Sequence, residues 1–231
     1  MHILIPVWFH GFDSIMYFIS SIIGFILSFY FYKIYSISNE KRHLYLYLGF
    51  LFLSMGLLIL SITNLFSYIA LSNCRNSCLL GITDNVFSFE DFSYLTYFGL
   101  SLFAYVMFLF AYRIKEFKFS KFFIIGFLAY LIVISILLPF NEEPRVWHSY
   151  HEYFHLVSLI MMGFLSFRNI INYIEKKSLG SLLVMVAFFF IFLFHLFHIF
   201  SFISGWMYIL AHISMMTGFS ALLLMVLRVK K

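Results

Sequence analysis

The chain has 231 residues, of which 63% are hydrophobic and only 11% carry a formal charge. Soluble domains carry about a quarter charged residues, and a chain of this size cannot hide so much apolar surface in one core. The net charge of +5 comes from short basic runs between apolar stretches, which excludes nucleic-acid binding. The composition therefore predicts an integral membrane protein whose main partner is the lipid bilayer.

Seven apolar segments are long enough to cross a bilayer as helices, which takes about 20 residues each. They lie at about 14–32, 44–71, 94–112, 122–140, 147–167, 180–203 and 206–227. Runs such as Phe188 to Phe192 lack the alternating polarity of a transmembrane strand. We expect an all-α fold in which residues 1–231 form a single polytopic seven-helix bundle, a multi-pass protein of the cell membrane.

Basic residues are concentrated in alternate connectors between these segments. Thirteen of the fifteen follow the first, third, fifth and seventh segments, namely Lys33, Lys41, Arg42, Arg113, Lys115, Lys118, Lys121, Arg168, Lys176, Lys177, Arg228, Lys230 and Lys231. The other connectors hold only Arg75 and Arg145. The positive-inside rule therefore predicts an outside N-terminus and an inside C-terminus. Because Leu227 is followed by only a short basic tail, we also expect no fused output domain.

The histidines are concentrated on one side of the predicted bundle. In this orientation only His43 of the nine lies inside; the outer set is His2, His10, His148, His151, His155, His195, His198 and His212. At about 1.5 Å per residue, the shallower members of the last three helices lie roughly 6–9 Å below the outer boundary and the deeper ones at roughly 12 Å. The shallower set is His151, His198 and His212, and the deeper pair is His155 and His195.

Helical spacing places these imidazoles on shared faces. His148, His151 and His155 follow an i, i+3, i+7 pattern, and His195 and His198 are also three apart. The short Ser204-Gly205 turn makes the last two helices antiparallel neighbours, so that His198 and His212 can face each other. Polar groups in a membrane usually point into the bundle. We therefore expect a shared centre, with Asn64 at the same depth on the second helix as a supporting hydrogen-bonding group.

Several kinds of chemistry fit such a centre. Two histidines from different helices can clamp the iron of a b-type haem, for which His155 and His195 are the candidates. Imidazoles also bind Zn or Cu, with Glu152 or a methionine as a further donor; the candidate metal ligands are His151, His155, His195, His198 and His212. The same side chains could instead line a wet outer cavity, relay protons or sense pH.

Other residues carry structural expectations. Asp13-Ser14 is typical of a helix N-cap, and Ser20, Gly24 and Ser28 form a stripe of small residues that lets another helix approach closely. Aromatic residues near the outer boundary, Trp206 and Tyr208 among them, are typical of the interfacial belt. The spacing of Cys74 and Cys78 permits a local disulfide, two free thiols, or a metal-binding or redox-active pair.

The seven helices, the outside N-terminus and the basic first inner connector, from Tyr32-Lys33 to Lys41-Arg42, resemble the seven-helix sensor domains of microbial receptors. That resemblance implies a ligand-sensing role in which the histidines line an outer pocket. Rhodopsins share the topology but hold retinal by a lysine that residues 206–227 lack. Seven-helix zinc hydrolases of the ceramidase and adiponectin-receptor type carry an H-x3-H pair on the last helix, whereas here the pair is His151/His155 on the fifth, and no aspartate lies in mid-membrane.

The first functional hypothesis is a haem- or metal-binding membrane protein, a redox or accessory subunit that passes electrons to a partner subunit or works as a homo-oligomer. The alternatives are a ligand sensor or scaffold of receptor-like fold and a metal-dependent intramembrane hydrolase.

Overall fold

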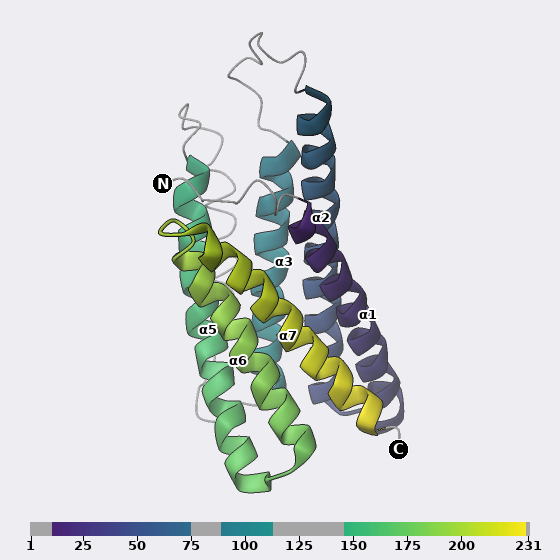
Figure 1. The fold of residues 1–231 in the computed structure, drawn as a ribbon. Coiled ribbons are helices and arrows are strands. Elements are labelled where there is room, and N and C mark those ends of the chain that lie inside the picture. The colour runs from purple at the N-terminus through teal and green to yellow at the C-terminus, as the bar shows by residue number, and fades with distance from the viewer. Residues whose placement is uncertain (1–10, 75–88, 113–145, 230–231) are drawn as a thin grey trace.

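The computed structural model describes residues 11–74, 89–112 and 146–229, and all regular structure within these ranges is α-helical (Figure 1). The helices are α1 (Phe12–Ser38), α2 (Lys41–Cys74), α3 (Phe89–Ala111), α5 (Val146–Lys176), α6 (Leu179–Ile199) and α7 (Gly205–Val229). All six are long and apolar enough to cross a membrane. The predicted all-α, multi-pass membrane architecture is therefore confirmed for the described residues. The span predicted at 122–140 lies outside them, as do His2, His10 and Cys78.

The helices alternate in direction along most of the chain. In Figure 1, α1, α3, α5 and α7 run one way, and α2 and α6 run the other way. Because α3 and α5 are parallel, α3 ends and α5 begins at opposite ends of the bundle. The count of seven and the orientation of the termini stay predictions.

Two tight turns join neighbouring antiparallel helices. Asn39 and Lys177 adopt left-handed conformations, with φ of 52° and 47°, directly after α1 and near the end of α5. The Asn39 N–H donates to the Tyr35 carbonyl at 2.8 Å, and the Lys177 N–H donates to the Tyr173 carbonyl at 2.8 Å. This is the usual way in which a helix ends on a left-handed residue. The turns fix α1 against α2 and α5 against α6.

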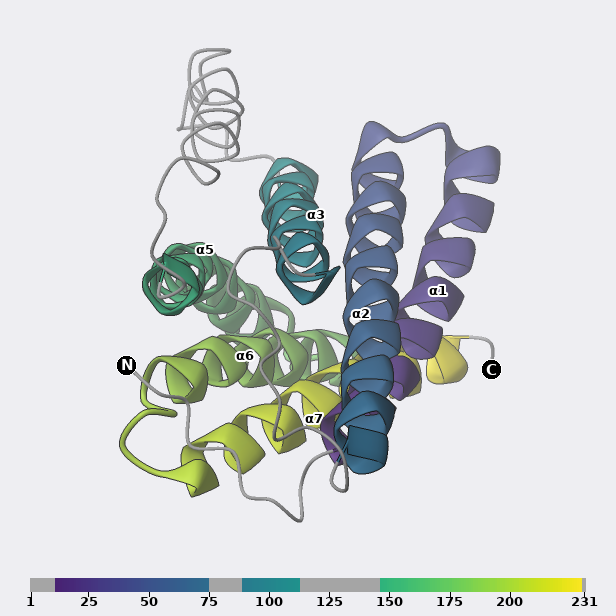
Figure 2. The ribbon, with the colours of Figure 1, turned by 90° about the horizontal axis from the view of Figure 1, so that it is seen from above.

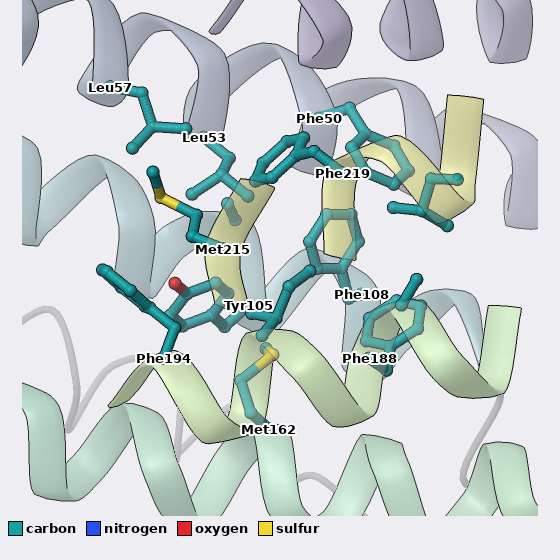
Figure 3. Packing of buried hydrophobic residues seen from close by; sticks show 14 of the residues in the cluster. Phe50, Leu53, Leu57, Tyr105, Phe108, Met162, Phe188, Phe194, Met215 and Phe219 are labelled. Carbon is teal, nitrogen blue, oxygen red and sulfur yellow. The ribbon is translucent and has the colours of Figure 1, made fainter. Parts of the chain in front are cut away.

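Neighbouring helices form a closed ring in the order α1, α2, α3, α5, α6, α7 and back to α1 (Figure 2). The middle of the bundle is filled by large apolar side chains that are at most 3% exposed (Figure 3), among them Phe50, Leu53, Leu57, Tyr105, Phe108, Met162, Phe188, Phe194, Met215 and Phe219. The rings of Phe50 and Phe108 are 4.8 Å apart between centroids, and those of Phe108 and Phe188 are 5.9 Å apart. Apolar residues are also exposed on the outside, as at Ile26, Phe29 and Ile160, which fits contact with lipid.

The predicted stripe of small residues on α1 packs against other helices, as expected. A Cβ at Gly24 would collide with the Ser54 hydroxyl on α2. The Ser28 hydroxyl donates to the Tyr47 carbonyl of α2 at 3.2 Å, and the Ser20 hydroxyl donates to the Met216 sulfur of α7 at 3.3 Å. Small side chains therefore bring α1 close enough for its hydroxyl groups to reach neighbouring backbone.

Candidate metal centre

Five imidazoles from α5, α6 and α7 meet near the end of the bundle where α6 ends and α7 begins. Four of them are at most 3% exposed, namely His155, His195, His198 and His212, whereas His151 is half-buried. The i, i+4 pair on α5 and the i, i+3 pair on α6 face each other because these helices are antiparallel neighbours. The structure thus brings together all the candidate metal ligands predicted from the sequence. Nothing is described for the side chains of His148 and Glu152.

Three of these imidazoles and a tyrosine form a continuous polar chain. The Tyr105 hydroxyl on α3 lies 2.8 Å from His195 Nε2, and His195 Nδ1 lies 2.9 Å from His155 Nδ1. At the other end, His155 Nε2 lies 3.2 Å from His151 Nε2. A neutral imidazole has one donor and one acceptor nitrogen, so all these hydrogen bonds can form with the donors pointing in either direction.

His198 has polar atoms that the fold does not satisfy. Its ring stacks on that of His155, with centroids 4.4 Å apart and planes 10° apart, and it lies 5.5 Å from His151 and 5.4 Å from His212. The side chain is 3% exposed, and within the described residues neither ring nitrogen has a hydrogen-bond partner. Buried polar groups are nearly always paired in proteins, and an unpaired one is costly. The two unpaired nitrogens of His198 therefore indicate a position where a ligand can bind.

The arrangement of three imidazoles fits a metal ion. His151, His155 and His198 each offer one nitrogen, and these atoms all lie within 4.8 Å of one another. Imidazole nitrogens bind Zn at about 2.0–2.1 Å, so two ligands of one ion lie at most about 4 Å apart, and binding would draw the three rings slightly closer together. Three histidine ligands leave a fourth position for water or another group.

His212 lies at the edge of the cluster. Its Nδ1 is 2.9 Å from the Tyr208 carbonyl oxygen, one turn earlier on α7. Donation of an Nδ1 proton to that carbonyl leaves Nε2 as the nitrogen with a lone pair. The His212 ring also packs on Tyr17 of α1, with centroids 4.9 Å apart. His212 thus joins the imidazoles to the N-terminal helix.

A second polar group surrounds Asp13, which is buried at the start of α1 with 5% exposure. One carboxylate oxygen accepts hydrogen bonds from the backbone N–H groups of Gly11 at 3.2 Å and Ser14 at 2.8 Å. The expected N-cap at Asp13-Ser14 was wrong, because the N-cap is Gly11 and Asp13 lies in the first turn of α1. The other oxygen accepts from the Tyr208 hydroxyl at 3.0 Å and from the Asn64 amide at 3.3 Å. The carboxylate therefore connects α1, α2 and α7.

Asn64 lies in this second group rather than among the imidazoles. Its amide nitrogen donates to Asp13, and its carbonyl oxygen accepts from the Tyr94 hydroxyl at 3.2 Å. Asn64 is connected to the histidines through Asp13 and Tyr208, whose ring lies 4.4 Å from His212. Its expected place beside the ligands came from its depth alone, which does not fix the direction in which α2 turns the side chain.

The interfacial role expected for Tyr208 was wrong. The side chain is only 4% exposed and bonds to Asp13, whereas the neighbouring Trp206 is 66% exposed, as an interfacial residue should be. The spacing of Tyr208, His212 and Met215 on one helical face was the signal that the tyrosine points inward.

Tyr105 was missed by sequence reasoning altogether. It is 2% exposed and follows Tyr97 and Ser101 at four-residue intervals, which forms a polar stripe on the otherwise apolar second half of α3. Such a stripe indicates the face of α3 that turns toward the bundle interior.

Comparisons of this chain with protein-family models, with curated protein sequences and with solved structures find no match.

Proposed function

We propose that this protein binds one first-row transition metal ion, Zn or Cu, inside the membrane through His151, His155 and His198. The observation that carries the proposal is the buried His198, whose unpaired nitrogens lie beside two more imidazoles with ligand atoms within 4.8 Å. A bound ion would take up the lone pair of each imidazole and so remove the cost of burying them. Imidazole donors suit both Zn and Cu.

The packing of the cluster favours an ion over haem. The Nδ1 atoms of His155 and His195, the pair expected to clamp a haem iron, are 2.9 Å apart. Two axial bonds of about 2 Å each would separate the ligand nitrogens by about 4 Å, with a flat macrocycle between them. Phe154 and Phe194 pack against both rings at centroid distances of 4.8 to 5.8 Å, in the space that a macrocycle would need.

The groups around the ion would hold its ligands in place. Metal-bound histidines usually donate their second N–H to a neighbouring acceptor, which fixes the orientation of the ring. The Nε2 atoms of His151 and His155 face each other, so both could bind the same ion. His155 Nδ1 would then be free to donate to His195, and His195 could donate to the Tyr105 oxygen. With Cu, which can change its oxidation state, a site buried this way would suit a redox subunit that exchanges electrons with a partner protein. With Zn, which has no redox chemistry, it would suit an accessory subunit.

An intramembrane hydrolase is the second candidate, because the structure supplies a carboxylate that the sequence pattern did not place. Asp13 is buried and connects through Tyr208 to the imidazoles. In that case an ion with an open fourth position would lower the pKa of a bound water.

Elemental analysis tests the metal site directly. Protein purified in detergent and dialysed against metal-free buffer should retain about one Zn or Cu per chain, as expected for three imidazole ligands. His155→Ala and His198→Ala should lose this metal while keeping their helix content. His43→Ala is the matched control, because His43 lies near the start of α2, at the end of the bundle opposite the cluster, and bonds to Ser38. A wild-type protein without metal, or a His198→Ala variant that retains its metal, would refute the proposal. A Soret band in the absorption spectrum would show that the site binds haem instead.

A further inference from the structure

A second hollow region lies at the opposite end of the bundle, where α2 and α6 begin and α3 and α5 end. It consists of two adjoining cavities of about 200 Å³ and about 300 Å³. Both are lined by Arg42, Tyr112, Asn172 and Lys176. This is the end of the bundle that the positive-inside pattern assigns to the cytoplasm.

The smaller cavity is basic. Arg42, Arg168 and Lys176 line it together with a single acidic residue, Glu175. Within the described part of the chain, none of the three cations forms an ion pair. Cations gathered around one hollow without carboxylate partners repel one another, so an anion placed between them is stabilised.

The larger cavity continues from two of these cations, Arg42 and Lys176, into the apolar interior. Its lining includes Phe31, Leu46, Phe50, Val184, Phe188, Leu222 and Met225. The first turn of α6 also contributes Ser178, Gly180 and Ser181, so the positive end of that helix faces the cavity. The combined space therefore has a cationic mouth and an apolar inner wall.

Tyr112, which lines both cavities, is held in place by a hydrogen bond. The Tyr112 hydroxyl donates to Asn169 Oδ1 at 2.7 Å, and the Asn169 amide donates to the Leu165 carbonyl at 2.8 Å. Asn169 is 1% exposed, and the Arg42 guanidinium lies over the Tyr112 ring at 5.8 Å. Arg42 is exposed, and its contact with the Tyr112 ring keeps it beside the mouth of the cavities.

We propose that these cavities bind an anionic phospholipid, with its phosphate on Arg42, Arg168 and Lys176 and an acyl chain against the apolar wall. Arginine pairs with phosphate through two parallel hydrogen bonds, and basic pockets between membrane helices are a known way to hold lipid headgroups. Neutral lipids lack the net negative charge that the mouth complements. Inorganic phosphate lacks the acyl chain that the inner wall complements.

Thermal unfolding in a neutral detergent tests this assignment. Added phosphatidylglycerol should raise the melting temperature of the wild type by about 3–6 °C, whereas phosphatidylcholine and inorganic phosphate should raise it by less than about 1 °C. The double variant Arg42→Gln/Lys176→Gln should lose most of this increase. Lys33→Gln/Arg228→Gln is the control, because it removes two cations at the same end of the bundle that line neither cavity.

Native mass spectrometry provides a second measurement that does not depend on the stability of the variants. Wild type and the control should retain a phosphatidylglycerol molecule that the Arg42→Gln/Lys176→Gln variant loses. Equal stabilisation by phosphatidylcholine or by inorganic phosphate, or equal lipid retention by both double variants, would overturn the proposal. The metal content at the histidine cluster is measured separately, so failure of either assignment leaves the other intact.

Discussion

Replacing Tyr105 with phenylalanine removes one hydroxyl from the end of the polar chain that leads to the proposed ion. Without metal, His195 can carry its proton on Nδ1 and donate it to His155, so the loss of the tyrosine leaves an acceptor lone pair rather than an N–H group unpaired, and buried acceptors without a partner are tolerated better than donors. An ion on His155 Nε2 reverses this direction, because His155 must then donate from Nδ1 to His195. The remaining His195 proton sits on Nε2, where only the Tyr105 oxygen, 2.8 Å away, accepts it.

The magnitude follows from this difference between the two states. A buried N–H group left without an acceptor costs about 1–3 kcal/mol, and Tyr105 is only 2% exposed, so water does not reach the position easily. At about 1.4 kcal/mol per tenfold change, this penalty weakens metal binding by about 5- to 150-fold. Loss of hydrogen-bonding partners of metal-bound histidines costs about 10- to 100-fold in other proteins, which agrees with this range.

Competition with a chromophoric chelator measures the affinity of the detergent-solubilised protein. Tyr97→Phe is the matched control, because Tyr97 lies two turns earlier on the same helix, is 3% exposed, and packs on Tyr17 and Phe154. We expect Tyr105→Phe to weaken binding by about tenfold or more and Tyr97→Phe to leave it within about twofold. Equal affinities for Tyr105→Phe and wild type, or equal losses in both variants, would refute the assigned direction of the hydrogen bonds.

Two further predictions concern packing and orientation. Gly24→Ala should destabilise the bundle by about 1–3 kcal/mol in denaturant titrations, because the new Cβ meets the Ser54 hydroxyl, and adding Ser54→Ala should recover most of the loss; no recovery would contradict the contact. In a background without the native cysteines, a membrane-impermeant maleimide should label Ser204→Cys in intact cells and Ser36→Cys only after permeabilisation, and the reverse pattern would invert the predicted orientation.

The positions of the membrane helices could be predicted from hydropathy because burial in lipid demands long apolar segments. Their ends could not be predicted equally well. The fifth segment was expected to end near residue 167, but α5 continues to Lys176, since a helix does not stop where the hydrocarbon does. Hydropathy also says nothing about which helices are neighbours, and the placement of α3 between α2 and α5 follows only from packing.

Depth along a helix could be predicted from the sequence, but rotation about its axis could be predicted only where several polar residues share a face. The histidine pairs on α5 and α6 satisfy this condition, and their side chains do meet. Asn64 follows Ser61 by three residues, which turns both toward the interior, but this spacing does not tell which helix they meet; both bond to α1, Ser61 to the Ser14 carbonyl and Asn64 to Asp13. Tyrosine generally prefers membrane interfaces, so the inward direction of Tyr105 and Tyr208 was not predicted.

Polar contacts also join the two halves of the bundle, one made of α1, α2 and α3 and the other of α5, α6 and α7. Contacts between α1 and α7 and between α3 and α5 are less extensive than those within each half. The Tyr208–Asp13 and Tyr105–His195 hydrogen bonds both cross between the halves. In lipid, apolar packing alone gives little preference for one partner helix, so such hydrogen bonds help to specify the arrangement. The proposed ion is bound by α5 and α6 but supported from α3, and its binding would therefore stabilise the same association of the two halves that assembles its site.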